Sequence, residues 1–331
     1  MADKALIGPW IRRFLLEHLV AERNLARNTQ ASYRDTLTLL LPFLSLTQKV
    51  PIDRLTIEDL SSVMLRRFLE HLEKERGCRD VTRNQRLGAI HSLAKFVGMR
   101  SPEHLAWCTE IRTIPFKKTA KPVMPYLEKP EMDALLKTPD LPTAQGARDY
   151  ALLLFLYNTG ARVEEAARLT VADLALENSP AVKLVGKGNK ARYCPLWPLT
   201  AEVLKPLTLG RALHERVFLN HRRQPLTRFG IYNLLQRIVD QASLKTPTLK
   251  TKRISPHCVR HTCAVHLLRS GVDINTIRAW LGHVSLDSTH VYAEVDLEMK
   301  AKALAHCDVP EEPGVKRWRK EPSLMAFLKA L

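Results

Sequence analysis

The chain has few of the features that mark a secreted or membrane protein. Its most apolar stretch, residues 151–157, is too short to cross a bilayer, and its N-terminus lacks the long apolar run of a signal peptide. The 6 cysteines among its 331 residues are irregularly spaced, which is typical of reduced thiols and not of a disulfide framework. We therefore expect a cytoplasmic protein.

Acidic residues are also in deficit. The chain carries 51 lysines and arginines against 34 aspartates and glutamates, which gives a formal net charge of +17. Such an excess suits a polyanionic partner, most commonly nucleic acid, although a basic solvated surface would produce the same count. The chain is 45% hydrophobic, so it can bury a core, and its length fits two domains.

The first third of the chain reads as helices with little strand signal. Apolar spacing predicts helices over residues 10–19, from 28 to near Pro42, over 57–74 and over 82–97. We expect residues 1–115 to form a helical, DNA-binding domain. Along the last of these helices, polar donors alternate with apolar positions, and this face suits contact with DNA or, equally, with solvent: Arg83, Asn84, Arg86, His91 and Lys95.

A change of composition marks the domain boundary. Residues 116–125 are rich in proline and lysine, which predicts an extended linker able to follow a phosphate backbone through Lys117, Lys118 and Lys121. We expect a second domain over residues 126–308 and a C-terminal tail over 309–331. Short strand patterns at 182–185 and 192–196 flank a glycine-rich turn within otherwise helical sequence. The predicted fold is mainly α with a small antiparallel β-sheet, arranged as a two-domain clamp.

The second domain holds residues suited to chemistry on a phosphate diester. Arg162 follows a Thr-Gly helix break, Lys187 lies in a glycine-flanked turn, and Arg260 stands three residues after His257, on the same face of a helix. A phenol such as that of Tyr292 is ionised to about one part in a thousand at neutral pH, so it needs a base or nearby cations to act as a nucleophile. Arginine forks bind phosphate oxygens in pairs.

Some residues in this region have competing interpretations. Cys258, His261, Cys263 and His266 could suggest zinc, but their spacing does not place four ligands on one helix face, and we expect no metal. Lys190 competes with Lys187 because both lie in the same turn. We interpret Arg192, Arg222 and Arg223 as non-specific phosphate contacts or plain surface.

The ordered set of motifs resembles the tyrosine recombinase, or phage integrase, family. The resemblance extends from about residue 8 to 305, with an N-terminal region similar to the family's core-binding domain and a catalytic domain after it. Five motifs occur in the family's order: Thr159-Gly160-Ala161-Arg162, Gly186-Lys187-Gly188-Asn189-Lys190, His257-Cys258-Val259-Arg260-His261, Leu281-Gly282-His283, and Tyr292.

The resemblance implies a role for each matching residue. Tyr292 would attack a DNA phosphate to form a 3′-phosphotyrosine and release a 5′-hydroxyl. Arg162 and Arg260 would clamp the phosphate, and Lys187 would be the general acid.

The remaining positions would assist them. His257 would aid proton transfer, His283 would hydrogen-bond a non-bridging oxygen, and Glu165 would support the first arginine. No metal or nucleotide cofactor is implied. The partners would be double-stranded DNA recombination sites and other recombinase subunits, in a tetramer that exchanges strands through a Holliday junction at the nucleoid.

Two alternatives also fit the sequence. A type IB-like topoisomerase would share the chemistry, and a non-catalytic DNA-binding protein would share the fold. A predicted helix over residues 296–306, after the tyrosine, favours an oligomeric recombinase because such a segment can dock on a neighbouring subunit. The long tail favours a mobile-element recombinase over a bacterial chromosome-dimer resolvase.

Overall fold

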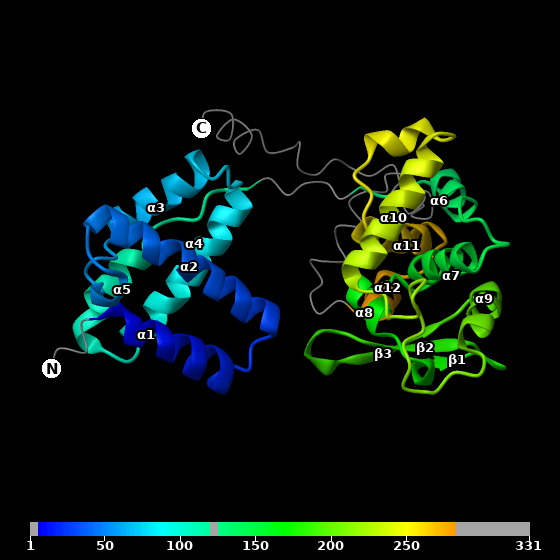
Figure 1. Cartoon of the computed structure of the whole chain (residues 1–331), viewed down its shortest axis with the longest axis horizontal. Helices are drawn as coiled ribbons and strands as arrows, with labels where there is room; N and C mark the ends of the chain where they lie inside the picture. Colours follow the sequence, from blue (N-terminus) through cyan, green and yellow to red (C-terminus); the bar gives the residue numbers. More distant parts are fainter. Residues whose placement is uncertain (1–5, 120–124, 283–331) are drawn as a thin grey trace, which may run out of the picture. The chain divides into compact units, whose positions relative to one another are not determined.

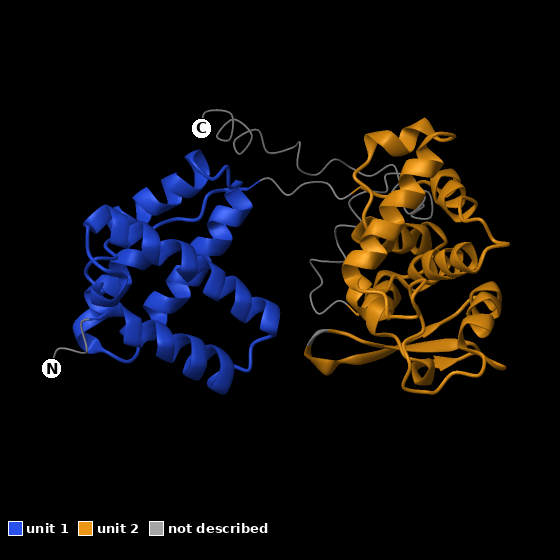
Figure 2. Ribbon diagram, viewed as in Figure 1, with its two compact units in different colours: residues 1–122 blue, residues 123–331 orange. Residues whose placement is uncertain are grey.

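The computed structural model describes residues 6–119 and 125–282, and of Lys187 it describes the backbone alone. The chain divides into two compact units, residues 1–122 and residues 123–331 (Figure 2). The division falls inside the segment predicted as a linker. The finer boundaries of the predicted linker and tail remain predictions.

The described residues of the first unit form helices joined by short loops (Figure 1). Helix α1 (Ile7–Arg13) continues into a π-helical segment (Phe14–Glu22) and is followed by α2 (Arg27–Gln48), α3 (Ser62–Lys74), α4 (Asp80–Gly98) and α5 (Leu105–Arg112). Their apolar faces meet in one core around Phe14, Phe68 and Phe96, all of which are fully buried.

Two of the predicted helix limits in this unit were wrong. Helix α2 does not stop near Pro42 but continues through it to Gln48, and Lys49 after it adopts a left-handed conformation with φ of 56°. Burial of Leu40 and Leu44 on either side of the proline outweighs the loss of one backbone hydrogen bond. Helix α3 starts at Ser62, later than predicted, and the Ser61 side chain accepts a hydrogen bond from the amide of Met64.

The second unit combines helices with a small sheet. Helices α6 (Lys129–Leu136), α7 (Ala144–Thr159) and α8 (Val163–Arg168) precede strands β1 (Leu174–Ala175), β2 (Ala181–Val185) and β3 (Ala191–Pro195). The strands form an antiparallel sheet in the order β1-β2-β3, with Leu184 opposite Arg192. Helices α9 (Pro198–Thr208), α10 (Arg228–Ser243), α11 (Pro256–Arg269) and α12 (Ile274–Leu281) follow. The predicted fold class, mainly α with a small antiparallel sheet, is confirmed.

Helix α7 supplies much of the core of the second unit. It is buried along most of its length and packs on α9 and α11. It ends at Gly160, whose φ of +58° is left-handed, and a Cβ there would lie 2.4 Å from Leu281 Cδ2. Glycine at this position therefore lets the end of α7 approach the end of α12. Short 3-10 turns complete the two units: Ile52–Arg54, Pro102–His104, Val171–Asp173, Lys187–Asn189 and Pro247–Thr251. Over the described ranges, no helix is long and apolar enough to cross a membrane.

Candidate active site

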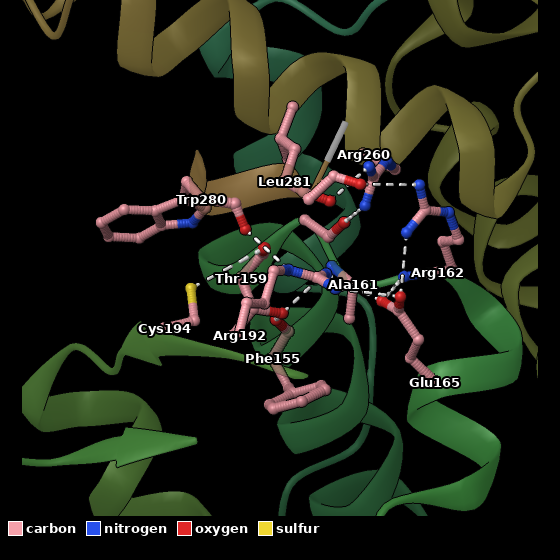
Figure 3. A network of polar contacts seen from close by, with 12 residues as sticks. Phe155, Thr159, Ala161, Arg162, Glu165, Arg192, Cys194, Arg260, Trp280 and Leu281 are labelled. Carbon is pink, nitrogen blue, oxygen red and sulfur yellow. Dashed lines mark hydrogen bonds and ion pairs between the residues drawn. The ribbon is translucent and has the colours of Figure 1, made fainter. Parts of the chain in front are cut away.

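Three arginines from three elements converge on the C-terminal end of α12 (Figure 3). Their targets are three consecutive backbone oxygens. Arg192 Nε donates to Trp280 O at 2.8 Å, Arg260 Nη2 to Leu281 O at 2.7 Å, and Arg162 Nη2 to Gly282 O at 3.3 Å. The last carbonyl groups of a helix have no partner within it and carry its partial negative charge. The end of α12 therefore gathers cationic groups from the residue that precedes α8, from β3 and from α11.

A buried carboxylate joins two of these arginines. Glu165 Oε1 accepts from Arg162 Nη1 and from Arg192 Nη1, both at 2.9 Å, and Glu165 Oε2 accepts from Arg192 Nη2 at 2.8 Å. Glu165 Oε2 also accepts from the backbone amide of Arg162 at 2.8 Å, which satisfies the start of α8. Burial alone would raise the pKa of Glu165, but its bonds to Arg192 and then to Arg162 hold that pKa below the usual value.

Arg260 is enclosed by the protein. It lies on α11, is only 5% exposed, and donates from Nη1 to Gly160 O at 2.5 Å as well as to Leu281 O. Its two bonds join the end of α7 to the end of α12. Arg260 therefore has a structural role whatever else it binds.

His257 lies on the same face of α11, one turn before Arg260. His257 as a whole is exposed to solvent, but protein atoms cover part of its imidazole ring and exclude water from it. This desolvation lowers the pKa of His257, and the positive charges of Arg260 and Arg162 lower it further. The imidazole is therefore held neutral near neutral pH beside two guanidinium groups.

The turn that contains Lys187 begins against the same cluster. A Cβ on Gly186 would lie 3.2 Å from Glu165 Oε1 and 3.6 Å from Arg162 Nη1, so the backbone passes close to both side chains. The Gly186 amide donates to Lys190 O at 2.9 Å, and Lys190 itself is exposed. The structure thus brings the start of the β2–β3 turn to the arginines.

The structure places four of the predicted site residues together and leaves others undescribed. Arg162, Glu165 and Arg260 lie around the end of α12, and His257 lies on α11 one turn before Arg260. His283 and Tyr292, together with Lys121 of the predicted linker, lie outside the described residues.

The interpretation of Arg192 as a phosphate contact or plain surface was wrong. Its side chain is only 10% exposed, and its guanidinium binds Glu165 and the end of α12. The position of Arg192 within β3 could have indicated that its side chain is buried. Arg192 is two residues before Cys194, which is fully buried, and alternate residues of a strand share one face. An arginine in an inward-facing position needs a buried partner.

The predicted DNA-facing side of α4 is partly covered by the chain itself. Arg83 is buried and donates to Pro115 O at 3.1 Å. The Asn84 side chain exchanges two hydrogen bonds with the backbone of Lys117, at 2.8 and 3.0 Å. His91 packs its ring on Phe116. These contacts fix residues 115–117, the start of the predicted linker, on α4.

The other basic residues of that region differ in their surroundings. Lys117 Nζ pairs with Glu73 Oε1 at 2.5 Å, and Arg86 is half-buried. Lys95 and Lys118 are exposed. A DNA-binding role for this set remains a prediction, and the exposed lysines are the members best placed to perform it.

The residues that suggested zinc have separate partners. Cys263 Sγ lies 3.7 Å from Asn158 O, and His266 Nδ1 bonds the Tyr157 hydroxyl at 2.7 Å. In the part of the chain that the structure describes, no group of three or more His, Cys, Asp or Glu residues could hold a metal ion.

Family models and known proteins match this chain over nearly its whole length. Residues 125–299 match the phage integrase family, and residues 11–100 match the phage integrase N-terminal SAM-like domain. The integrase/recombinase y4rC of Sinorhizobium fredii is 35% identical over 333 residues, which covers 100% of both proteins. The tyrosine recombinase XerC of Bacillus subtilis is 31% identical, covering 87% of this chain and 92% of that protein.

Solved structures share the fold. The XerH site-specific recombinase bound to its difH substrate has a TM-score of 0.65 and 23% identity, covering 88% of this chain and 83% of that one. A lambda integrase tetramer bound to a Holliday junction has a TM-score of 0.62 and 14% identity, covering 88% and 78%. The protein belongs to the phage integrase family of tyrosine recombinases.

Proposed function

We propose that this protein is a site-specific recombinase that cuts and rejoins double-stranded DNA, with Tyr292 as the nucleophile. The observation that carries the assignment of the site is the convergence of Arg162 and Arg260 on one point, with His257 beside them. Two guanidinium groups that converge from different elements provide a seat for a phosphate diester.

The two arginines differ in what they offer a phosphate. Arg162 is 34% exposed on its side chain, and its bond to Gly282 O is long at 3.3 Å, so a phosphate oxygen can compete for that donor. Arg260 is buried and holds one edge of the seat in place. In the transition state, charge builds on the non-bridging oxygens, where both guanidinium groups stabilise it.

In the reaction, the Tyr292 oxygen forms a bond to phosphorus while the bond from phosphorus to the 5′-oxygen breaks. The phenolic proton leaves with the help of neutral His257, and Lys187 gives a proton to the departing oxygen. His283 hydrogen-bonds a non-bridging oxygen. The product is a 3′-phosphotyrosine, whose ester bond conserves the energy needed for religation, so no nucleotide cofactor or metal is required.

We further propose a tetramer on DNA that exchanges strands between two duplexes through a Holliday junction. The family membership and the lambda integrase tetramer bound to a Holliday junction support this assembly. The two units would close on DNA as a clamp, and the protein would act at the nucleoid.

A role in moving a mobile element is the biological function we favour. The match to the integrase/recombinase y4rC spans the full length of both proteins, including the tail of this chain, whereas the match to XerC spans 87% of this chain. The tail over residues 309–331 would then dock on a partner subunit.

The test starts from DNA that the full chain selects from a randomised duplex library. A nick beside the cleavage position in the selected site lets the cut end diffuse away and traps the covalent complex. We expect wild type to yield a protein–DNA adduct on a denaturing gel and Tyr292→Phe to yield none while binding the site equally well. Absence of the adduct from wild type on a tightly bound site would contradict the proposal.

A second assay separates recombination from topoisomerase activity. Two duplexes of different length that each carry the selected site should yield recombinant lengths. Relaxation of supercoiled plasmid without any recombinant product would instead favour a topoisomerase.

A further inference from the structure

Arg192 binds a carboxylate and a helix end at the same time. Its two terminal nitrogens form parallel bonds to the two oxygens of Glu165, at 2.9 and 2.8 Å, and its Nε bonds Trp280 O at 2.8 Å. All three nitrogens of the guanidinium are used inside the protein (Figure 3). A planar fork bound at three points has one orientation.

The lack of a side chain at Gly282 leaves room for the side chain of Arg192. Gly282 has φ of +66°, and a Cβ there would lie 3.0 Å from Arg192 Cδ and 3.2 Å from Arg192 Nη1. The backbone at the end of α12 therefore passes directly over the guanidinium. Gly282 is the residue from which the chain continues to His283.

Through Glu165, the same fork sets the surroundings of Arg162. Arg162 Nη1 shares Glu165 Oε1 with Arg192 Nη1. If Arg192 were lost, Glu165 Oε2 would keep only the backbone amide of Arg162, and the Arg162 guanidinium would turn toward the vacated oxygens. It would then leave Gly282 O, which it holds by a long bond.

We propose that Arg192 is a positioning residue for DNA cleavage. It fixes Glu165 and the last turn of α12 to each other, and so sets the direction of Arg162 and the point from which the chain continues to His283. The inference rests on the proposed function for its catalytic consequence, but its structural consequence can be measured without DNA.

The chain offers a matched control for substitutions of Arg192. Arg148 is similarly covered, with 12% of its side chain exposed, and it also binds a buried carboxylate and a backbone carbonyl. Its partners are Asp149 and Leu219 O, which line neither α12 nor the arginine cluster. Loss of either arginine removes the same kinds of bonds, so a general effect on folding appears in both.

The experiment compares Arg192→Lys and Arg192→Gln with Arg148→Lys and Arg148→Gln in the full chain. The first measurement is amide hydrogen exchange without DNA. We expect the amides of Leu281 and Gly282 to exchange at least about tenfold faster in both Arg192 variants and at the wild-type rate in the Arg148 variants. Arg192→Lys should not restore the slow exchange of wild type, because a single ammonium group cannot reproduce the three-point contact.

The second measurement is single-turnover formation of the covalent complex on the nicked site. We expect both Arg192 variants to lose about 100-fold in rate, which is the scale of an ångström-sized misplacement, while their affinity for DNA changes less than about threefold. The Arg148 variants should cleave near the wild-type rate. Unchanged exchange at Leu281 and Gly282 would overturn the inference, as would equal cleavage losses in the two sets of variants.

The two proposals fail in different ways. If wild type forms no adduct, the proposed function fails, and amide exchange alone decides whether Arg192 positions α12. If wild type cleaves and Arg192→Gln cleaves equally fast, the proposed function stands and the inference about Arg192 falls.

Discussion

Arg260 and Leu281 are joined by a hydrogen bond of 2.7 Å between the guanidinium Nη2 and the backbone oxygen. The other terminal nitrogen of Arg260 bonds Gly160 O, so this buried side chain connects two helix ends. Arg162, by contrast, is one-third exposed and reaches the end of α12 through a single long bond. The two arginines that we assign to the phosphate therefore carry different shares of the folding energy.

This difference predicts separate outcomes for their removal. Arg162→Ala and Arg260→Ala should each slow covalent-complex formation by about 100- to 1,000-fold, because each removes a charge-assisted contact to the transition state. Arg260→Ala should also lower the free energy of unfolding by about 2–4 kcal/mol, because it leaves two buried carbonyl groups without this donor. Arg162→Ala should cost less than about 1.5 kcal/mol. Equal losses of stability, measured by urea unfolding, would contradict this division.

Glu165 should make stability depend on pH in the acidic range. Its folded pKa lies below the ordinary value of 4.5, so the carboxylate contributes stability above pH 4.5 that is lost as the pH falls through the folded pKa. Glu165→Gln should destabilise by about 3 kcal/mol at pH 7, because it leaves Arg162 and Arg192 facing each other without a counter-charge. That difference should shrink as the pH is lowered below 4.5.

The control for this variant is its neighbour. Glu164 is exposed and pairs with the exposed Arg168 at 2.8 Å, so Glu164→Gln should change stability by less than about 0.5 kcal/mol at any pH. A constant difference between Glu165→Gln and wild type across the acidic range would show that folding does not shift the pKa of Glu165.

His257 should titrate at lower pH than an ordinary imidazole. Its side-chain resonance in the full chain, followed by NMR, should show an inflection below about 6.5, because partial desolvation and two arginines disfavour the charged ring. Arg162→Gln should raise the inflection, whereas Arg222→Gln, at an exposed arginine of the same unit, should leave it unchanged. The unfolded ring binds its proton more tightly, so this group reduces stability as the pH falls below about 6.5. An inflection at the ordinary pKa would place His257 away from the arginines.

A methyl group at Gly282 should cost more than its backbone strain. Gly271 has φ of +84° with nothing within 4 Å of a Cβ, so Gly271→Ala should lose only the cost of a left-handed alanine, about 1 kcal/mol. Gly282→Ala should lose at least about 1 kcal/mol more, because its Cβ crowds Arg192. It should also slow cleavage, as judged by single-turnover trapping. An equal loss of stability in the two alanine variants would mean that the Arg192 side chain moves aside at no energetic cost.

A sulfur substitution can decide between Lys187 and Lys190 as the general acid. A thiolate leaves without needing a proton, so a DNA strand with sulfur in place of the bridging 5′-oxygen should cleave normally in a variant that lacks the acid. We expect Lys187→Ala to be slow on ordinary DNA and restored on the sulfur substrate. Lys190→Ala should behave the same on both. The reverse pattern would transfer the role to Lys190.

The sequence predicted the class of fold because long amphipathic helices leave a periodic apolar pattern. The predicted end of α2 was wrong because proline does not always stop a helix. Here, the burial of leucines on both sides of Pro42 keeps the helix intact. The sequence did not anticipate α5, α9 or β1, which are short or begin near prolines. These elements owe their conformation to tertiary packing more than to local pattern.

The site was predictable only in part. Motifs in the sequence pointed to Arg162, His257 and Arg260, because each of these side chains belongs to a short pattern of neighbouring residues. The groups that hold these arginines in place are backbone oxygens at residues 280–282, and every residue has one, so no pattern reveals them. Arg192 was misread because its carboxylate partner is 27 residues away along the chain.

The close passage of Gly282 over Arg192 links the evolution of two distant positions. A relative that replaces the glycine has to shorten or redirect the side chain at 192, and a relative that loses the arginine no longer needs glycine to make room for it. The two positions should therefore vary together, and an exchange of one alone should be rarer than an exchange of both. Designers who graft this catalytic unit onto a new DNA-binding partner should transfer the two residues as a single block.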